Sequence, residues 1–255
     1  CVSVCPHAAL RAKVFDPDKL NQAPTGFRSA DYKAKDFAGK KFVVQVAPED
    51  CTGCTLCTQV CPAKSKAEPV KKALTMTPIE KNLEAEIANF KFFMGLPEAD
   101  RSLLNPNMIK SVALMRPLFE FSGACVGCGE TPYIKMMTQL FGDRLVVANA
   151  TGCSSIYGGN LLTTPYAKNE KGFGPAWANS LFEDNAEFGV GMRSSVDSRT
   201  EFAVQLVNEL KDELGAELVD GLLNADQTTE TGIEGQRKLV EVLKAKLKTL
   251  NSAKA

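Results

Sequence analysis

Apolar and β-branched residues gather in short patches along the first part of this chain and predict a mixture of strands and helices. Residues 42–46 are rich in valine and predict a strand, and residues 70–76 predict a second one. Residues 79–94 carry Leu83, Ile87 and Phe90 at helical spacing and predict a helix, which Gly95 ends. These elements indicate a small α+β unit over residues 1–98, in which residues 6–50 form a long insertion.

After a connector over residues 99–118, which two Xaa-Pro steps interrupt, the pattern becomes that of an α/β layer structure. Thr131 as N-cap and Pro132 at the first helical position predict the start of a helix, and Gly142 predicts its end. Its apolar face would consist of Ile134, Met137 and Leu140.

A continuous apolar run at residues 145–148 follows that helix and is typical of a buried strand in a parallel sheet. Residues 151–155 predict a turn, and residues 158–176, rich in Gly, Asn and Pro, predict a long loop. Helices are expected over residues 194–214 and 233–250. The last of them carries an apolar stripe made of Leu239, Val242, Leu243, Leu247 and Leu250.

Charge and composition exclude several classes of protein. The 255 residues include 30 basic and 30 acidic side chains, so no basic stripe suggests a nucleic-acid partner. No apolar run reaches the length of a membrane span. The nine cysteines fall in or near C-x2-C and C-x3-C spacing, which indicates thiolate ligands kept reduced rather than disulfides. We therefore expect a cytoplasmic protein, in an oxygen-poor setting.

The most specific motif is the run Cys51, Cys54, Cys57 and Cys61, followed by Pro62. Its spacing, C-x2-C-x2-C-x3-C-P, is the bacterial-ferredoxin signature for 4Fe-4S clusters, in which the fourth cysteine serves the other cluster. Structural zinc is the alternative, but a zinc site has no use for the offset fourth cysteine and the proline.

Cys1 and Cys5, followed by Pro6, match the second half of another such run. By the same rule Cys5 completes the cluster of Cys51, Cys54 and Cys57, while Cys1 and Cys61 supply half the ligands of a second cluster. We therefore expect the chain to be a fragment of a longer polypeptide, with two more cysteines just upstream of Cys1. The alternative reading of Cys1 and Cys5 is a pair of buried free thiols.

Three further cysteines, Cys125, Cys128 and Cys153, lie on loops that flank the predicted α/β element. Three thiolates require a fourth ligand, and no other cysteine of this chain remains to provide it. Spacing alone also allows zinc or a redox thiol pair. Glu130, just before the predicted helix, would be stabilised by the helix dipole whether or not it contacts a cofactor.

Three segments around these residues closely resemble the pyruvate:ferredoxin (flavodoxin) oxidoreductases, thiamine-diphosphate iron–sulfur enzymes of anaerobic metabolism. They are residues 123–133 (GACVGCGETPY), 149–159 (NATGCSSIYGG) and 175–189 (PAWANSLFEDNAEFG). The resemblance covers essentially the whole chain in order. It implies an α+β ferredoxin-like two-cluster domain at residues 1–98, followed by part of an α/β thiamine-diphosphate-binding domain at residues 119–255.

The resemblance implies that Cys125, Cys128 and Cys153 ligate a third 4Fe-4S cluster, proximal to thiamine diphosphate, with a fourth cysteine beyond Ala255. It also implies that Glu130 and Cys153 lie at the thiamine diphosphate site. The Gly-Asp-Gly motif and its Asn partner, which bind Mg²⁺ and the diphosphate in this family, are missing from the sequence. We expect that motif after Ala255, and we expect the fragment alone to be inactive.

The implied activity of the full-length enzyme is the oxidative decarboxylation of pyruvate with coenzyme A to acetyl-CoA and CO₂. Electrons would leave through the clusters to ferredoxin or flavodoxin, and we expect a homodimer. Two alternatives remain open. One is an electron-transfer module without its own catalysis, and the other is an oxidoreductase for 2-oxoglutarate or another 2-oxoacid, since the residues that contact substrate lie outside this chain.

Overall fold

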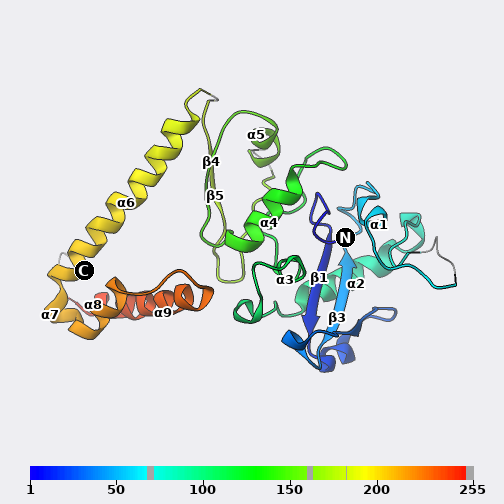
Figure 1. Ribbon diagram of the computed structural model, residues 1–255, viewed down its shortest axis with the longest axis horizontal. Coiled ribbons are helices and arrows are strands. Elements are labelled where there is room, and N and C mark those ends of the chain that lie inside the picture. Colours follow the sequence, from blue (N-terminus) through cyan, green and yellow to red (C-terminus); the bar gives the residue numbers. More distant parts are fainter. Residues whose placement is uncertain (68–71, 160–162, 182, 251–255) are drawn as a thin grey trace. The chain divides into compact units, whose positions relative to one another are not determined.

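A computed structural model describes residues 1–67, 72–159, 163–181 and 183–250 (Figure 1). It divides the chain into two compact units, Cys1–Glu183 and Asp184–Ala255. The expected domain boundaries at residues 98 and 118 both fall inside the first unit, so the division into a ferredoxin-like part and a thiamine-binding part stays a prediction.

The first unit contains a three-stranded antiparallel sheet of β1 (Leu10–Phe15), β2 (Ala30–Asp31) and β3 (Lys41–Val46), in the order β1-β3-β2. The strand expected at residues 42–46 is confirmed as β3. Strand β1 was not expected, because Arg11 and Lys13 interrupt its apolar residues, yet all six of its residues are buried. Both cations are buried because each has an acidic partner, Glu120 for Arg11 and Glu98 for Lys13.

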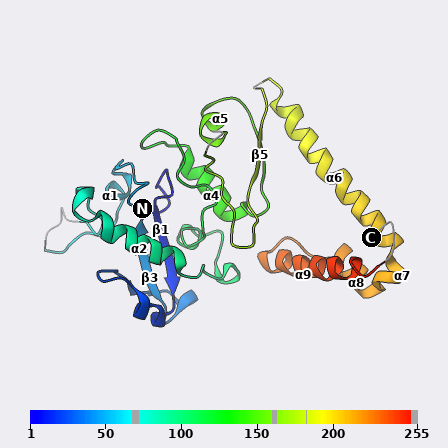
Figure 2. The same cartoon turned by 180° about the vertical axis from the view of Figure 1, so that it is seen from behind.

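Helix α2 (Leu83–Gly95) lies across the sheet (Figure 2). Its Phe93 packs with Phe15 of β1, Val43 of β3 and Leu96 in a fully buried cluster. The expected helix is thus confirmed, with a separate 3₁₀ turn at its start, Ile79–Lys81. The strand expected at residues 70–76 begins outside the described residues, and Lys72 forms only an isolated bridge to Lys64.

The expected connector is part of the core rather than an exposed linker. It contains a 3₁₀ turn, Arg101–Leu103, and the short helix α3 (Ile109–Val112). Its Leu104, Leu114 and Met115 pack in one cluster with Leu10 and Val14 of β1. Two further 3₁₀ turns, Pro17–Gln22 and Lys35–Phe37, lie between the strands.

Helix α4 (Thr131–Phe141) begins and ends where the sequence predicts, but its cap and its buried face differ from expectation. The N-cap residue is Glu130 rather than Thr131. The fully buried side chains are Thr131, Lys135, Thr138 and Gln139, whereas Ile134, Met137 and Leu140 are half-buried. Three of these four polar side chains, Lys135, Thr138 and Gln139, donate hydrogen bonds to backbone carbonyls, which offsets the cost of their burial.

Strands β4 (Val146–Asn149) and β5 (Ala176–Asn179) form a two-stranded parallel sheet, which confirms a parallel strand near residues 145–148. Val146 is nevertheless 50% exposed, so β4 is not the buried strand expected. Helix α5 (Cys153–Gly158) replaces most of the expected turn. A Cβ on Gly159 would lie 2.9 Å from the Trp177 ring, so glycine allows that ring to approach the end of α5.

The second unit is helical in its described residues. It consists of α6 (Asn185–Glu209), α7 (Lys211–Leu214), α8 (Ala216–Leu223) and α9 (Glu230–Leu247), so the two expected helices are confirmed in place but with different ends. Its core combines Leu210, Leu214 and Val219 with Leu243, Leu247 and Leu250. Val242, a member of the expected apolar stripe, is 48% exposed. Among the described residues no helix is long and apolar enough to cross a membrane.

Candidate functional site

The loop that carries Cys51, Cys54 and Cys57 turns sharply at two left-handed positions before the short helix α1 (Leu56–Gln59). Gly53 has φ +68° and Thr55 has φ +65°. The first is easy for glycine, while the second is strained for a β-branched residue. These turns let the loop present all three thiols to one side, where they line the same cavity.

Cys5, from a segment far away in the sequence, lines the same cavity. The cavity is lined by Cys5, Cys51, Cys54 and Cys57, together with the apolar side chains of Leu10, Val46 and Met76, and has a volume of about 40 Å³. All four cysteines are free thiols. The four cysteines that the spacing assigned to one cluster are therefore the four that the fold brings together.

The electrostatics of these thiols show that they affect one another. Burial raises the pKa of Cys57, and the neighbouring thiols of Cys5, Cys51 and Cys54 raise it further, while the backbone N–H of Thr58 acts in the opposite direction. The backbone N–H of Leu10 donates to Cys5 Sγ at 3.4 Å. Hydrogen bonds to sulfur are among the factors that set the potential of an iron–sulfur cluster.

The donor set fits a 4Fe-4S cluster better than a single ion. Within the described ranges, no three His, Cys, Asp or Glu side chains converge closely enough to hold one metal ion. A zinc site needs its ligands around a single point at bond lengths near 2.3 Å, whereas a cubane cluster takes four cysteines spread around its volume. The four cysteines that line one cavity have the number and type of ligands that a 4Fe-4S cluster takes.

Cys61 and Cys1 do not line that cavity. Cys61 is 6% exposed. Burial acts to raise the pKa of its thiol, but backbone hydrogen bonds at Ala63, Leu74 and Ala73 and the charge of Lys72 outweigh it and hold the pKa below its usual range. Cys1 is half-buried and packs against the β1 core. Cys61 thus sits apart from the four-thiol cavity, as expected for a ligand of another cluster, but the chain supplies no complete second set.

The third cysteine group lies at the start of two helices. Cys125 and Cys128 close a tight turn before α4, in which the Cys128 N–H donates to the Cys125 carbonyl at 3.0 Å and Gly127 has φ +73°. Cys153 is the first residue of α5. Cys125 and Cys153 are exposed and Cys128 is half-buried. The structure does not bring these three thiols into a site for one ion.

The turn at Gly127 lies close to the first cysteine loop. A Cβ on Gly127 would lie 3.9 Å from Cys54 Cβ, with no other atom nearer. Nothing in the spacing of the cysteines indicates this proximity. The two candidate cluster sites are therefore neighbours in the first unit.

Glu130 accepts a hydrogen bond from Tyr157, a residue to which the sequence pattern assigned no role. The Tyr157 hydroxyl donates to Glu130 Oε1 at 2.5 Å. Burial raises the pKa of Tyr157 well above its usual range, and the hydrogen bond and charge of Glu130 add to this effect. Burial and the Glu130 charge also raise the pKa of Tyr166 to about 12. The sequence signal that could have drawn attention to Tyr157 is its spacing from Cys153. Residues four apart lie on the same face of a helix, so Tyr157 would lie on the same side of the segment as that cysteine.

Comparison with known proteins matches residues 1–65 to a family described as "4Fe-4S dicluster domain". A pyruvate-flavodoxin oxidoreductase of Nostoc sp. is 59% identical over 247 residues, which cover 97% of this chain and 21% of that protein. A probable pyruvate-flavodoxin oxidoreductase of Escherichia coli is 51% identical over 253 residues, 99% of this chain and 21% of that protein.

A pyruvate:ferredoxin oxidoreductase of Moorella thermoacetica is 54% identical over 199 residues, 78% of this chain and 16% of that protein. The resemblance that the motifs predicted is confirmed. The chain spans about a fifth of the length of the curated relatives that it matches most fully.

Proposed function

We propose that this chain contributes the iron–sulfur part of a pyruvate:ferredoxin or pyruvate:flavodoxin oxidoreductase. The whole enzyme would decarboxylate pyruvate oxidatively, with coenzyme A as acetyl acceptor, and reduce ferredoxin or flavodoxin. The observation that carries the proposal is the cavity lined by Cys5, Cys51, Cys54 and Cys57, within a segment that is similar to the dicluster family.

In this proposal Cys5, Cys51, Cys54 and Cys57 hold one 4Fe-4S cluster, Cys1 and Cys61 contribute to a second, and Cys125, Cys128 and Cys153 contribute to a third. A bound 4Fe-4S cluster supplies one-electron transfer at a potential tuned by charge, hydrogen bonding and burial. The chain's own residues would provide that tuning: the Leu10 N–H donates to Cys5 Sγ, and the apolar side chains of Val46 and Met76 line the cavity beside the cysteines.

The residues of this chain support the binding of thiamine diphosphate and Mg²⁺ less strongly than the binding of iron–sulfur clusters. Glu130 lies at the N-terminus of α4, where the helix dipole favours negative charge, but its carboxylate is engaged by Tyr157. The Gly-Asp-Gly motif is missing from the sequence. We therefore propose for Glu130 and Cys153 only a place near the cofactor of the whole enzyme.

A pure electron carrier is the weaker candidate. The dicluster match ends at residue 65, whereas similarity to the oxidoreductases continues through nearly all of the remaining chain.

A different 2-oxoacid substrate is the other alternative. It is tested by comparing the rates of viologen reduction by the full-length enzyme with pyruvate and with 2-oxoglutarate. We further propose a homodimer in a reducing, cytoplasmic setting, in keeping with the nine free cysteines.

The test is iron binding by the full-length gene product, purified without air. Cys54→Ser should lose about four irons per chain and one reduced-cluster signal in electron paramagnetic resonance (EPR). Met76→Leu is the matched control, since it lines the same cavity, keeps its volume and carries no ligand. A folded wild-type protein that contains no iron would refute the proposal.

A further inference from the structure

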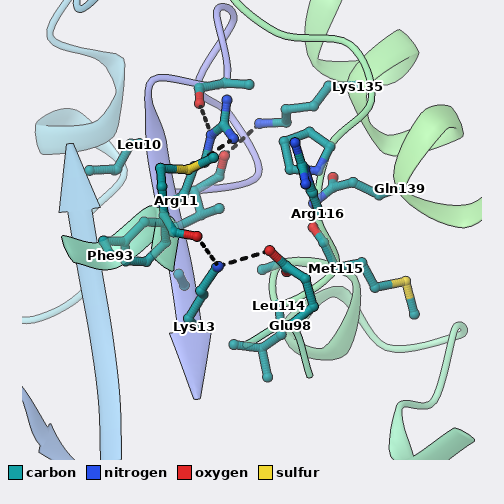
Figure 3. A pocket seen from close by; sticks show the side chains of 16 residues that line it. Leu10, Arg11, Lys13, Phe93, Glu98, Leu114, Met115, Arg116, Lys135 and Gln139 are labelled. Carbon is teal, nitrogen blue, oxygen red and sulfur yellow. Dashed lines mark hydrogen bonds and ion pairs between the residues drawn. The ribbon is translucent and has the colours of Figure 1, made fainter. Parts of the chain in front are cut away.

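Lys135 extends from α4 into the turn that carries Cys5. Its side chain is almost fully buried, with the residue 2% exposed. Its Nζ donates to the Val2 carbonyl at 2.6 Å and to the Cys5 carbonyl at 2.9 Å. Figure 3 shows the ammonium group beside Arg11, near the start of β1. A residue that lies between Cys128 and Cys153 of the third cysteine group thus binds the backbone of Cys5, a candidate ligand of the first cluster.

This buried ammonium lacks the carboxylate partner that the neighbouring cations have. Arg11 pairs with Glu120, and Lys13 pairs with Glu98 at 2.8 Å. Lys135 forms no ion pair within the part of the chain that the structure describes, where its polar partners are the two carbonyls. A buried charge is stable only when hydrogen bonds or an opposite charge offset its desolvation.

The missing negative charge is available at Cys5. The Lys135 ammonium lies 2.9 Å from the Cys5 carbonyl oxygen, so the residue that it contacts is one of the four that would ligate the cluster. A cluster ligated by four thiolates carries more negative charge than one thiolate, and gains one further negative charge on reduction. A fixed cation nearby favours that reduced state, because Coulomb attraction is strong at short range in a buried site.

We propose that Lys135 is a positioning residue for the cluster of Cys5, Cys51, Cys54 and Cys57, with two effects. Its hydrogen bonds fix the Val2–Cys5 turn, and its positive charge raises the reduction potential of that cluster. The proposal rests on the proposed function, since it requires a cluster at these four thiols. Lys135 acts through the turn and through its field, and it ligates no iron.

The test compares Lys135→Met with Lys135→Arg in the full-length protein, purified without air and titrated at pH 7. The cluster is identified as the EPR signal that Cys54→Ser lacks. At a fixed solution potential, Lys135→Met should lower the reduced-to-oxidised ratio at least tenfold, a shift of 59 mV to more negative potential for one electron. Lys135→Arg keeps the charge and should stay close to wild type.

An unchanged potential in a Lys135→Met protein with full iron content overturns the inference, while the proposed function stands. If Lys135→Met does not fold, Lys135→Gln replaces it, because Gln keeps a donor for the carbonyls without the charge. Iron loss in Lys135→Gln but not in Lys13→Gln supports the positioning effect, and equal loss in both overturns it. A wild-type protein without the cluster refutes both proposals.

Discussion

The hydroxyl of Tyr157 donates a hydrogen bond to the carboxylate of Glu130, and this bond joins the start of α4 to α5. Glu130 follows Cys128 by two residues, and α5 begins at Cys153. The bond therefore ties together the two segments that carry the third cysteine group. The geometry makes Tyr157 a support for those segments, whatever the two helices bind.

Tyr157→Phe should loosen α5. The change removes the hydroxyl that donates to the Glu130 carboxylate. Loss of a hydrogen bond to a charged acceptor lowers the free energy of unfolding by roughly 1.5–3 kcal/mol. Hydrogen exchange of the α5 amides in the full-length protein should accelerate by tenfold or more. Tyr133→Phe is the control, because Tyr133 is 70% exposed. Equal exchange rates in both variants would show that the bond contributes nothing.

The phenol of Tyr166 should titrate late. Burial, with help from Glu130, raises its pKa from 10.0 to about 12. Between pH 10 and 12 the unfolded chain loses this proton while the folded chain keeps it, so stability falls as pH rises through that window, by roughly 1–2 kcal/mol after allowance for solvent screening. Below pH 10 this contribution is fully present.

The measurement for Tyr166 is the difference in absorbance at about 295 nm between wild type and Tyr166→Phe during titration, which isolates this one phenol from the others. The substitution Glu130→Gln should move the midpoint back toward 10, since it removes the charge. A midpoint that stays at about 12 in Glu130→Gln would assign the shift to burial alone.

Gly159→Ala should destabilise the first unit. The added Cβ would lie 2.9 Å from the Trp177 ring and 2.8 Å from the Ser155 carbonyl oxygen, so the ring or the end of α5 must move. Overpacking of this kind costs about 1–3 kcal/mol. A thermal shift assay should show a lower melting temperature for Gly159→Ala, while Gly123→Ala, which has open space around it, leaves the temperature unchanged.

Glu120→Ala should cost far more than the loss of an exposed carboxylate. Arg11 and Glu120 are both largely buried, with side chains 6% and 18% exposed. Removal of Glu120 therefore leaves the buried guanidinium of Arg11 without its carboxylate partner. The expected loss is about 3 kcal/mol or more. Glu241→Ala removes the partner of Lys244 in an exposed pair and should cost under about 1 kcal/mol. Urea unfolding of the full-length variants compares the two, and equal losses would contradict the prediction.

Sequence reasoning identified the elements whose signals are local. The position of Pro132, strand propensity and helical periodicity predict, from a few neighbouring residues each, the helix that has Pro132 in its first turn, the strand at residues 42–46 and the helix over residues 79–94. The set Cys5, Cys51, Cys54 and Cys57 was predictable for the same reason, because three ligands lie in one loop and the ferredoxin rule supplies the fourth.

Tertiary structure alone decided the contacts between distant segments. Arg11 and Lys13 could be buried in β1 only because Glu120 and Glu98 come from elsewhere in the chain. Three further relationships likewise join segments far apart in sequence: Lys135 donates to the Cys5 carbonyl, Tyr157 donates to Glu130, and Gly127 lies beside Cys54. Chain geometry restricts the conformations of a short motif, so its structure can be predicted from neighbouring residues. These long-range pairings depend instead on how the whole first unit packs, and no local sequence pattern indicates that packing.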